Sequence, residues 1–436
     1  MYGLSLLDRG VLNLLVDPIR RDLGASDVQI SLLQGFAFVT FYCVCGIPLG
    51  WLADRASRRR LIFLGVLTWS LATASCGLAQ NYGQLLAARF MVGAGEAALL
   101  PAAYSMISDL FPRHKVTTAI GIFSLGAVAG SGLSSVIGGG IIALAIHHDF
   151  GAVVGHSHAP SWRTVFVLTG CLGFLPAFLV LSVPEPARHR FRSSRAPLAF
   201  WGFVATNKMF LATHFIGFSF ISLAINAGAA WMPTYINRHF GLAMTVVGPS
   251  IGTGVALFGI LGMSLGTRLV DRILAGGRAD AHFRYFVFGG IMVAILGAAA
   301  SIMPDAWPAI LLYSATYFFT PVAVAGAALQ LVAPSELRGR LSALFLIAFN
   351  LLSLGVGPLA VSVTTRYLFR DPELLGPSIG AVFAVFGLAG AAVLAAGRAP
   401  ARAAMAAAHP SSPPSSPVAP VDRYATSRED VAAKPA

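Results

Sequence analysis

Charged residues are scarce in this chain. Lys, Arg, Asp and Glu make up 11% of its 436 residues, whereas soluble domains carry about 25%. Cysteine is also rare, and the four cysteines lie in apolar segments without the spacing of a metal site or a disulfide framework. The start lacks a basic segment followed by a small-residue cleavage site, so we expect no cleavable signal peptide. These features exclude a secreted disulfide scaffold and an ordinary soluble domain.

Long apolar runs are abundant instead, and hydrophobic residues make up 56% of the chain. A membrane-spanning helix needs about 20 residues, and ten runs without Asp, Glu, Lys or Arg reach that length. Two more apolar segments contain charges, which gives twelve predicted spans. The charge-free runs are 28–53, 61–88, 116–148, 164–184, 209–237, 239–267, 285–304, 306–335, 341–365 and 374–397, and the charged segments are 1–18 and about 85–107.

The basic residues predict how the spans are oriented. The net charge is +12, but Lys and Arg form no single patch, so nucleic acid is not an expected partner. Most of them lie in alternate loops beginning with 54–60, and such loops are usually cytoplasmic. We therefore expect a multi-pass protein of the bacterial inner membrane with both termini in the cytoplasm. The region 398–436, rich in Ala, Pro and Ser, is expected to be a disordered cytoplasmic tail.

The two halves of the chain resemble each other. The loop pattern around Asp54 recurs in degraded form at Asp271, an offset of 217, and Pro112–Phe123 matches Pro334–Phe345 at an offset of 222. Similar loops at similar offsets indicate a parallel repeat of two six-helix bundles. We place the bundles at 1–183 and 208–397, joined by a cytoplasmic linker at 184–207 that contains a short interfacial helix near 198–204.

The charged spans are the expected functional centre. A charge in the middle of a membrane helix costs roughly 2.5–3.5 kcal/mol, so it should face a protein interior or a wet cavity. Arg89 and Glu96 share one helix face, about 10 Å apart along the axis. Asp8 and Arg9 follow Met1 so closely that we expect the natural protein to begin further upstream, which would move both charges to mid-membrane. We expect all four side chains to meet in one central chamber.

Two motifs resemble a known family. The loop from Gly50 to Arg60 closely resembles the signature cytoplasmic loop of the major facilitator superfamily, with Ser57 where that family usually has Gly. The segment Arg89-x-x-x-Gly93-x-Gly95 looks like the fourth-helix motif of the same superfamily. The resemblance covers residues 1 to about 397. It implies an all-α membrane protein with twelve transmembrane helices in two pseudo-symmetric bundles around a cavity.

Shorter features resemble the spinster-like branch of that superfamily. They are Asp8-Arg9, Gly95-Glu96-Ala97, Ser108 to Pro112 and Gly130-Ser131-Gly132. The resemblance implies lipid substrates, including phosphorylated sphingoid bases and lysophospholipids, transport driven by protons, and a monomer. The stretch 126–140 lacks the proline of the drug-antiporter pattern, which argues against a typical drug/proton antiporter.

We therefore predict a transporter and not an enzyme, with protons as the coupling ion and neither a cofactor nor a metal. Asp8 and Glu96 are the predicted proton carriers. Burial raises the pKa of a carboxyl group and a neighbouring arginine lowers it, so these two groups could bind and release a proton. Arg89 is their predicted exchangeable partner, and Arg9 is expected to pair with Asp8 or to reach the substrate headgroup.

Two further groups of residues complete the predicted mechanism. The family resemblance places Asp54 near Leu341, at the start of a helix whose dipole favours a carboxylate. The core spans of the second half contain no formal charge, which favours an amphipathic solute over a sugar. The predicted cytoplasmic gate consists of Asp54, Arg55, Arg58 and Asp109, and the candidate polar cavity residues are His214, Asn226, Tyr317 and Asn350.

Three alternatives stay open at this point. The protein could export another organic or drug-like solute, or it could be a passive lipid flippase without proton coupling. The charged residues could also form a static ion network that only fixes helix packing. A membrane-embedded lipid enzyme is disfavoured, because the sequence has no metal-ligand cluster and no Gly-x-Ser-x-Gly motif.

Overall fold

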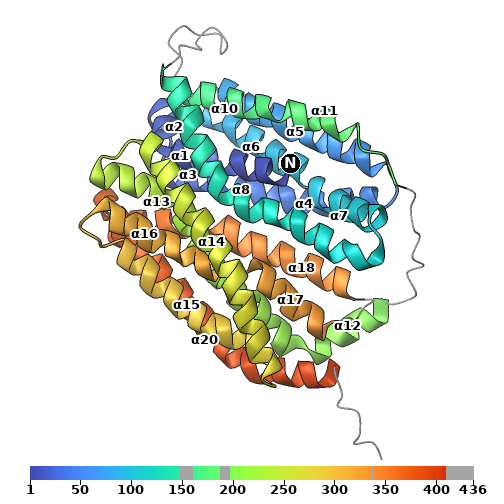
Figure 1. The fold of residues 1–436 in the computed structure, drawn as a ribbon. Coiled ribbons are helices and arrows are strands. Elements are labelled where there is room, and N and C mark those ends of the chain that lie inside the picture. Colours follow the sequence, from blue (N-terminus) through green and yellow to red (C-terminus); the bar gives the residue numbers. More distant parts are fainter. Residues whose placement is uncertain (148–160, 187–196, 335–336, 409–436) are drawn as a thin grey trace, which may run out of the picture.

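The computed structural model describes residues 1–147, 161–186, 197–334 and 337–408. Eleven helical segments in these ranges are long and apolar enough to cross a membrane. The first charged segment forms one more pair of helices, so the predicted twelve-span, all-α architecture is confirmed. In Figure 1 the first half of the chain lies above the second half.

The first half contains ten α-helices and one π-helical turn within its described residues. They are α1 (Tyr2–Leu14), α2 (Val16–Leu23), α3 (Asp27–Ser31), η1 (Leu32–Phe36), α4 (Ala37–Ala53), α5 (Arg58–Leu78), α6 (Tyr82–Glu96), α7 (Leu99–Leu110), α8 (Arg113–His147), α10 (Ser161–Leu172) and α11 (Phe174–Val180). The short helix α12 (Pro197–Thr206) follows in the connection between the halves, where an interfacial helix is predicted.

The second half is built in the same way. Its elements are α13 (Lys208–Phe240), α14 (Met244–Ala275), α15 (Ala281–Ala300), α16 (Ala306–Ala315), η2 (Thr316–Phe319), α17 (Val322–Val332), α18 (Arg338–Asn350), η3 (Leu351–Gly355), α19 (Val356–Val363), η4 (Thr364–Phe369), η5 (Pro372–Leu374) and α20 (Leu375–Ala408). The last helix runs past the predicted start of the tail at 398. The alanine-rich sequence after Arg398 explains this, because alanine has the highest helix propensity.

Two sides of the molecule are distinguished below. The linker side carries α12, the end of α4 and the start of α5, and it lies on the right in Figure 1. The far side carries the end of α2, the start of α3 and the end of α13. On the far side, Gly24 ends α2 and Gly241 ends α13 with φ of 61° and 70°, left-handed values that glycine adopts without strain. The capping box of Ser26 and Gln29 then starts α3.

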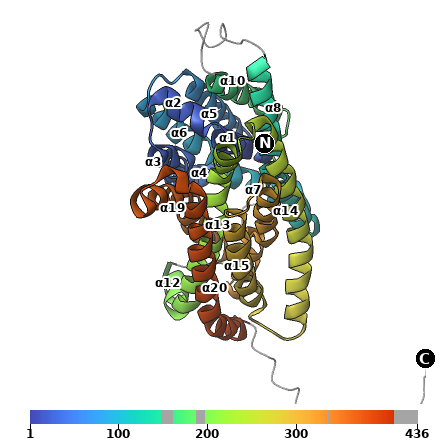
Figure 2. The same cartoon turned by 90° about the vertical axis from the view of Figure 1, so that its left-hand side faces the viewer.

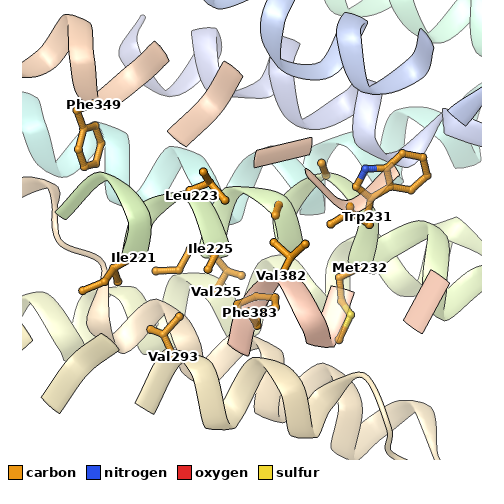
Figure 3. Close-up of a cluster of buried hydrophobic side chains, with 14 of the residues drawn as sticks. Ile221, Leu223, Ile225, Trp231, Met232, Val255, Val293, Phe349, Val382 and Phe383 are labelled. Carbon is orange, nitrogen blue, oxygen red and sulfur yellow. The ribbon is translucent and has the colours of Figure 1, made fainter. Parts of the chain in front are cut away.

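The core of the second half is tightly packed around α13. Its buried side chains include Ile221 and Ile225, which lie toward Val293 of α15 and Phe383 of α20 in Figure 3. Figure 2 shows α15 and α20 side by side with α13 behind them. Small residues allow this close approach, because a Cβ at Gly297 would lie 2.1 Å from the Phe383 ring.

The halves meet where two π-helical turns face each other. A Cβ built on Gly35 of η1 would lie 2.1 Å from the carbonyl oxygen of Leu354 in η3. Close by, the Ser31 hydroxyl donates to the Pro358 carbonyl at 3.0 Å, and the Gln34 amide donates to the Ala230 carbonyl at 3.0 Å. The contact between the halves near the far side therefore depends on a residue without a side chain at position 35.

We predict that Gly35→Ala shifts the protein away from the arrangement in which the far side is closed. The added methyl group would collide with the other half, and overpacking of this kind costs about 1–3 kcal/mol. Distances between spin labels placed on the two halves at the far side should broaden toward longer values. Gly46→Ala on the same span is the matched control, because a Cβ there would meet nothing within 4 Å. Equal distance distributions in both variants would contradict the prediction.

Candidate functional site

The structure brings the four charged residues of the first and fourth spans together. Asp8 and Arg9 lie on α1, and Arg89 and Glu96 lie on α6. Arg9 donates to Oε2 of Glu96 from Nε at 3.2 Å and from Nη2 at 2.5 Å. The exposed fractions of Asp8, Arg89 and Glu96 are 1%, 0% and 2%. In contrast, the side chain of Arg9 is 22% exposed, so the cluster is accessible through Arg9.

The ring of Phe38 lies close to both arginines. The Cζ atom of Arg9 lies 4.1 Å from the ring centroid of Phe38, and the Cζ atom of Arg89 lies 5.9 Å from the same centroid. A ring face attracts a cation electrostatically when water is excluded. Phe38 follows η1 directly, and its carbonyl oxygen would lie 2.2 Å from a Cβ on Gly93. The glycine of the fourth-helix motif therefore lets α4 approach α6 closely enough for Phe38 to reach both arginines.

The roles of the two arginines differ from the sequence-based expectation. Arg9, and not Arg89, pairs with Glu96. Arg89 donates to two backbone carbonyl groups, those of Leu33 at 3.3 Å and Asp8 at 3.4 Å. Oδ1 of Asp8, Oε1 of Glu96 and Nη2 of Arg89 are buried without a hydrogen-bond partner in the described ranges. Because these polar atoms are costly to leave unpaired, the cluster is suited to gain or lose a proton.

A second cluster lies on the linker side. Arg58 is 1% exposed, and it pairs with Asp109 through Nη1 and with Glu185 through Nε at 3.0 Å. The same guanidinium group donates to the hydroxyl of Ser105 at 3.0 Å and to the carbonyl of Pro186 at 2.8 Å. The cluster therefore ties the loop before α5 to the end of α7 and to the start of the linker.

The sequence-based reasoning missed Glu185. Its carboxylate caps α5, accepting hydrogen bonds from the backbone N–H groups of Arg58 and Arg59 at 3.2 and 2.9 Å and from the Ser57 hydroxyl at 2.7 Å. Partial burial alone would raise the pKa of Glu185, but these hydrogen bonds and the one from Arg58 lower it to about 2. A carboxylate between two prolines just after a span was the available signal.

The other two residues of the predicted gate are exposed. Asp54 is the C-cap residue of α4. The Cζ atom of Arg55 lies 3.9 Å from the ring centroid of Trp51, and its Nη1 donates to the Trp51 carbonyl at 3.4 Å. Arg55 therefore stacks on its own helix.

The far side holds an ion network that the sequence did not suggest. Arg238 of α13 donates to Asp17 at 2.6–3.2 Å and to Asp27 at 3.1–3.3 Å, so one guanidinium group joins two carboxylates of the opposite half. Arg20 adds a contact to Asp27 at 3.3 Å. Bidentate arginine–carboxylate pairs are the stronger kind of ion pair. In this conformation the far side is closed by charge pairing between the halves.

The candidate polar residues of the second half do not form a group. His214 is 0% exposed and is packed among phenylalanine rings, with Nε2 2.9 Å from the Ala325 carbonyl. Tyr317 contacts the hydroxyl of Tyr313 at 3.2 Å, and Asn226 donates to the Ser222 carbonyl at 2.9 Å. Asn350 is half-buried at the end of α18. His214 is therefore fully buried among aromatic rings in this conformation.

Comparisons with known proteins agree with this architecture. The family model described as Major Facilitator Superfamily matches residues 1–358. An MFS-type efflux pump of Mycolicibacterium smegmatis is 26% identical over 377 residues, 84% of this chain and 83% of the pump. Protein spinster of Drosophila melanogaster is 27% identical over 281 residues, 61% of this chain and 43% of that protein.

A solved structure gives the same result for the fold. The structure is that of a bacterial homologue of the human lysosomal transporter spinster, in an inward-facing and occupied conformation. It matches with a TM-score of 0.72 at 24% identity and covers 92% of this chain and 94% of that chain. At this identity the match shows a shared fold.

We predict that Glu185→Gln destabilises the protein at neutral pH and that the effect shrinks in acid. Because the folded-state pKa is lowered, the ionised carboxylate stabilises the fold above its usual pKa of 4.5, and this stabilisation is lost as the pH falls toward about 2. Thermal unfolding of both proteins should therefore show a gap at pH 7 that narrows below pH 4.5. A gap that is constant or widens in acid would contradict this assignment.

Proposed function

The chain belongs to the major facilitator superfamily, and on that basis we propose that it is a proton-coupled secondary active transporter of an amphipathic, lipid-like solute. Members of this superfamily are transporters and not enzymes. The observation that carries the proposal is the buried cluster of Asp8, Arg9, Arg89 and Glu96, in which each carboxylate keeps an oxygen atom without a donor.

Proton binding follows from the burial of these carboxylates. An ionised carboxylate that lacks hydrogen-bond donors in a low-dielectric interior is strongly disfavoured, and a bound proton removes its charge. Glu96 forms an ion pair with Arg9 in the present arrangement. A proton that reached Glu96 would remove the charge attraction in this pair and so loosen Arg9. The exposed part of Arg9 would then be available to an anionic headgroup, so proton binding and solute binding would use the same guanidinium group.

Alternating access is supported by the closed far side. The network of Arg238, Asp17 and Asp27 joins the halves there, and it must separate before the far side can open. The distribution of Lys and Arg predicts that the linker side is cytoplasmic. We therefore place the linker, both termini and the Arg58 cluster in the cytoplasm of a bacterial cell, and the Arg238 network on the outer side.

The lipid-like nature of the solute is supported by the difference between the halves. The first half supplies the charged cluster, whereas the core spans of the second half contain no Asp, Glu, Lys or Arg. Such a combination suits a molecule with a charged head and an apolar chain. Export of another organic or drug-like solute is the second candidate, favoured by the 26% identity with an efflux pump over most of both chains.

The decisive variant is Glu96→Gln, which keeps a hydrogen-bonding partner for Arg9 and cannot bind a proton. In proteoliposomes, a fluorescently labelled lysophospholipid should be moved by a pH gradient in the wild-type protein. We expect the variant to lose gradient-driven uptake, by at least tenfold, while exchange of label across the membrane without a gradient continues. An internal pH dye should show proton movement only in the wild-type protein.

Glu373→Gln is the matched control, because Glu373 is exposed in the short helix η5, outside the charged cluster. Gradient-driven transport that survives Glu96→Gln undiminished would refute proton coupling at this cluster and favour a static ion network. Wild-type transport that ignores the gradient would indicate a passive flippase. A drug-like dye carried in place of the lysophospholipid would favour the second candidate.

A further inference from the structure

A separate basic cluster lies on the linker side of the second half. The carboxylate of Asp280 is 2% exposed, and its Oδ2 atom accepts hydrogen bonds from Nε of Arg398 at 2.8 Å and Nη1 of Arg402 at 3.0 Å. Nη2 of Arg284 lies 3.9 Å from the same oxygen atom. The side chains of Arg284, Arg398 and Arg402 are 38%, 32% and 51% exposed. Three guanidinium groups are thus held around one carboxylate, with a surplus of positive charge.

Few hydrogen bonds from this cluster reach other side chains among the described residues. Three guanidinium groups carry about 15 N–H donors, and two hydrogen bonds reach Asp280. The Nε atom of Arg284 is buried and has no partner among the described residues. Burial alone would raise the pKa of Asp280, but the arginines lower it, so the carboxylate stays ionised and holds the guanidinium groups in place. The three like charges repel one another, and a further anion would relieve that repulsion.

The position of the cluster corresponds to lipid headgroups. Arg398 is the first charged residue after the charge-free run 374–397, so it lies where the last span leaves the bilayer. Arg402 lies one helical turn beyond it. Arg284 lies one turn inside α15, at a depth where a long basic side chain reaches the interface.

An apolar surface continues from the cluster into the membrane. On α15, Phe288 follows Arg284 by four residues and Ile295 follows it by eleven, so all three lie on one helix face. Phe288 and Ile295 are both 54% exposed. A phosphate on the arginines would therefore have its acyl chain alongside Phe288 and Ile295, which distinguishes a phospholipid from a free anion.

We propose that Arg284, Arg398 and Arg402, preoriented by Asp280, bind the phosphate of an anionic phospholipid in the linker-side leaflet. Arginine recognises phosphate through paired, charge-assisted hydrogen bonds. This site lies outside the Asp8–Glu96 cluster, and it depends on the membrane-spanning fold and not on the transported solute. A lipid bound there would connect α15 to the end of α20.

The test measures thermal unfolding of the full-length protein in detergent, with added phosphatidylglycerol or with phosphatidylcholine of the same acyl chains. We expect phosphatidylglycerol to stabilise the wild-type protein more. Arg402→Gln should raise the phosphatidylglycerol concentration needed for half of the effect by about fivefold, the contribution of one basic residue near an anionic membrane. The variant leaves the Arg398–Asp280 pair in place, so the fold should persist.

Two further variants guard against a trivial result. Arg272→Gln removes an exposed arginine at the end of α14 on the same side, and it should leave the response to phosphatidylglycerol unchanged. The triple variant Asp280→Asn, Arg398→Gln, Arg402→Gln removes the buried carboxylate together with two of the three arginines, and it should abolish the preference for phosphatidylglycerol. The proposal is overturned if Arg402→Gln and Arg272→Gln behave alike, if both lipids stabilise the protein equally, or if inorganic phosphate alone stabilises it to the same extent.

Discussion

A lipid bilayer cannot solvate an ion, and this constraint governs where the charges of this protein lie. Within the first and fourth spans, Arg9 and Glu96 neutralise each other, and Phe38 covers one face of Arg9. Arg89 has no carboxylate partner of this kind and depends on backbone carbonyl groups made available beside η1. Three features thus act together to stabilise the buried charges. They are the π-helical turn, the cation–π contact and the glycines of α6.

The same constraint explains how much could be predicted. Charge-free runs predicted the spans, because a helix satisfies the backbone hydrogen bonds of such a run within the run itself, as lipid requires. The meeting of Asp8, Arg9, Arg89 and Glu96 was predictable for the same reason, since isolated charges at membrane depth must find one another. The partner of each arginine was not predictable, because it depends on the position of Phe38, a side chain that the sequence shows as one of 30 phenylalanines.

Contacts near the membrane surface were harder to foresee. Arg238 lies 221 residues from Asp17 and 211 from Asp27 in the sequence, and all three lie at helix ends, where water could solvate each of them separately. Because water can solvate them, leaving them unpaired would carry no large burial cost that the sequence could reveal. Glu185 is similar, since a glutamate in a loop needs no partner. At these positions the tertiary arrangement of the helix ends determines which charges pair. Inside the membrane, the composition of the span already indicates that its charges must pair.

The glycines of α6 have one more consequence. A Cβ on Gly93 would lie 2.2 Å from the Phe38 carbonyl oxygen of α4, and one on Gly95 would lie 2.7 Å from the Trp69 backbone nitrogen of α5. Contacts this close prevent the helices from sliding past one another, so α4, α5 and α6 move as one rigid unit. The Arg9–Glu96 pair lies near the middle of this unit, where Gly95 meets Trp69, and the Arg58 cluster lies at its linker-side end, so a small tilt of the whole unit displaces both together.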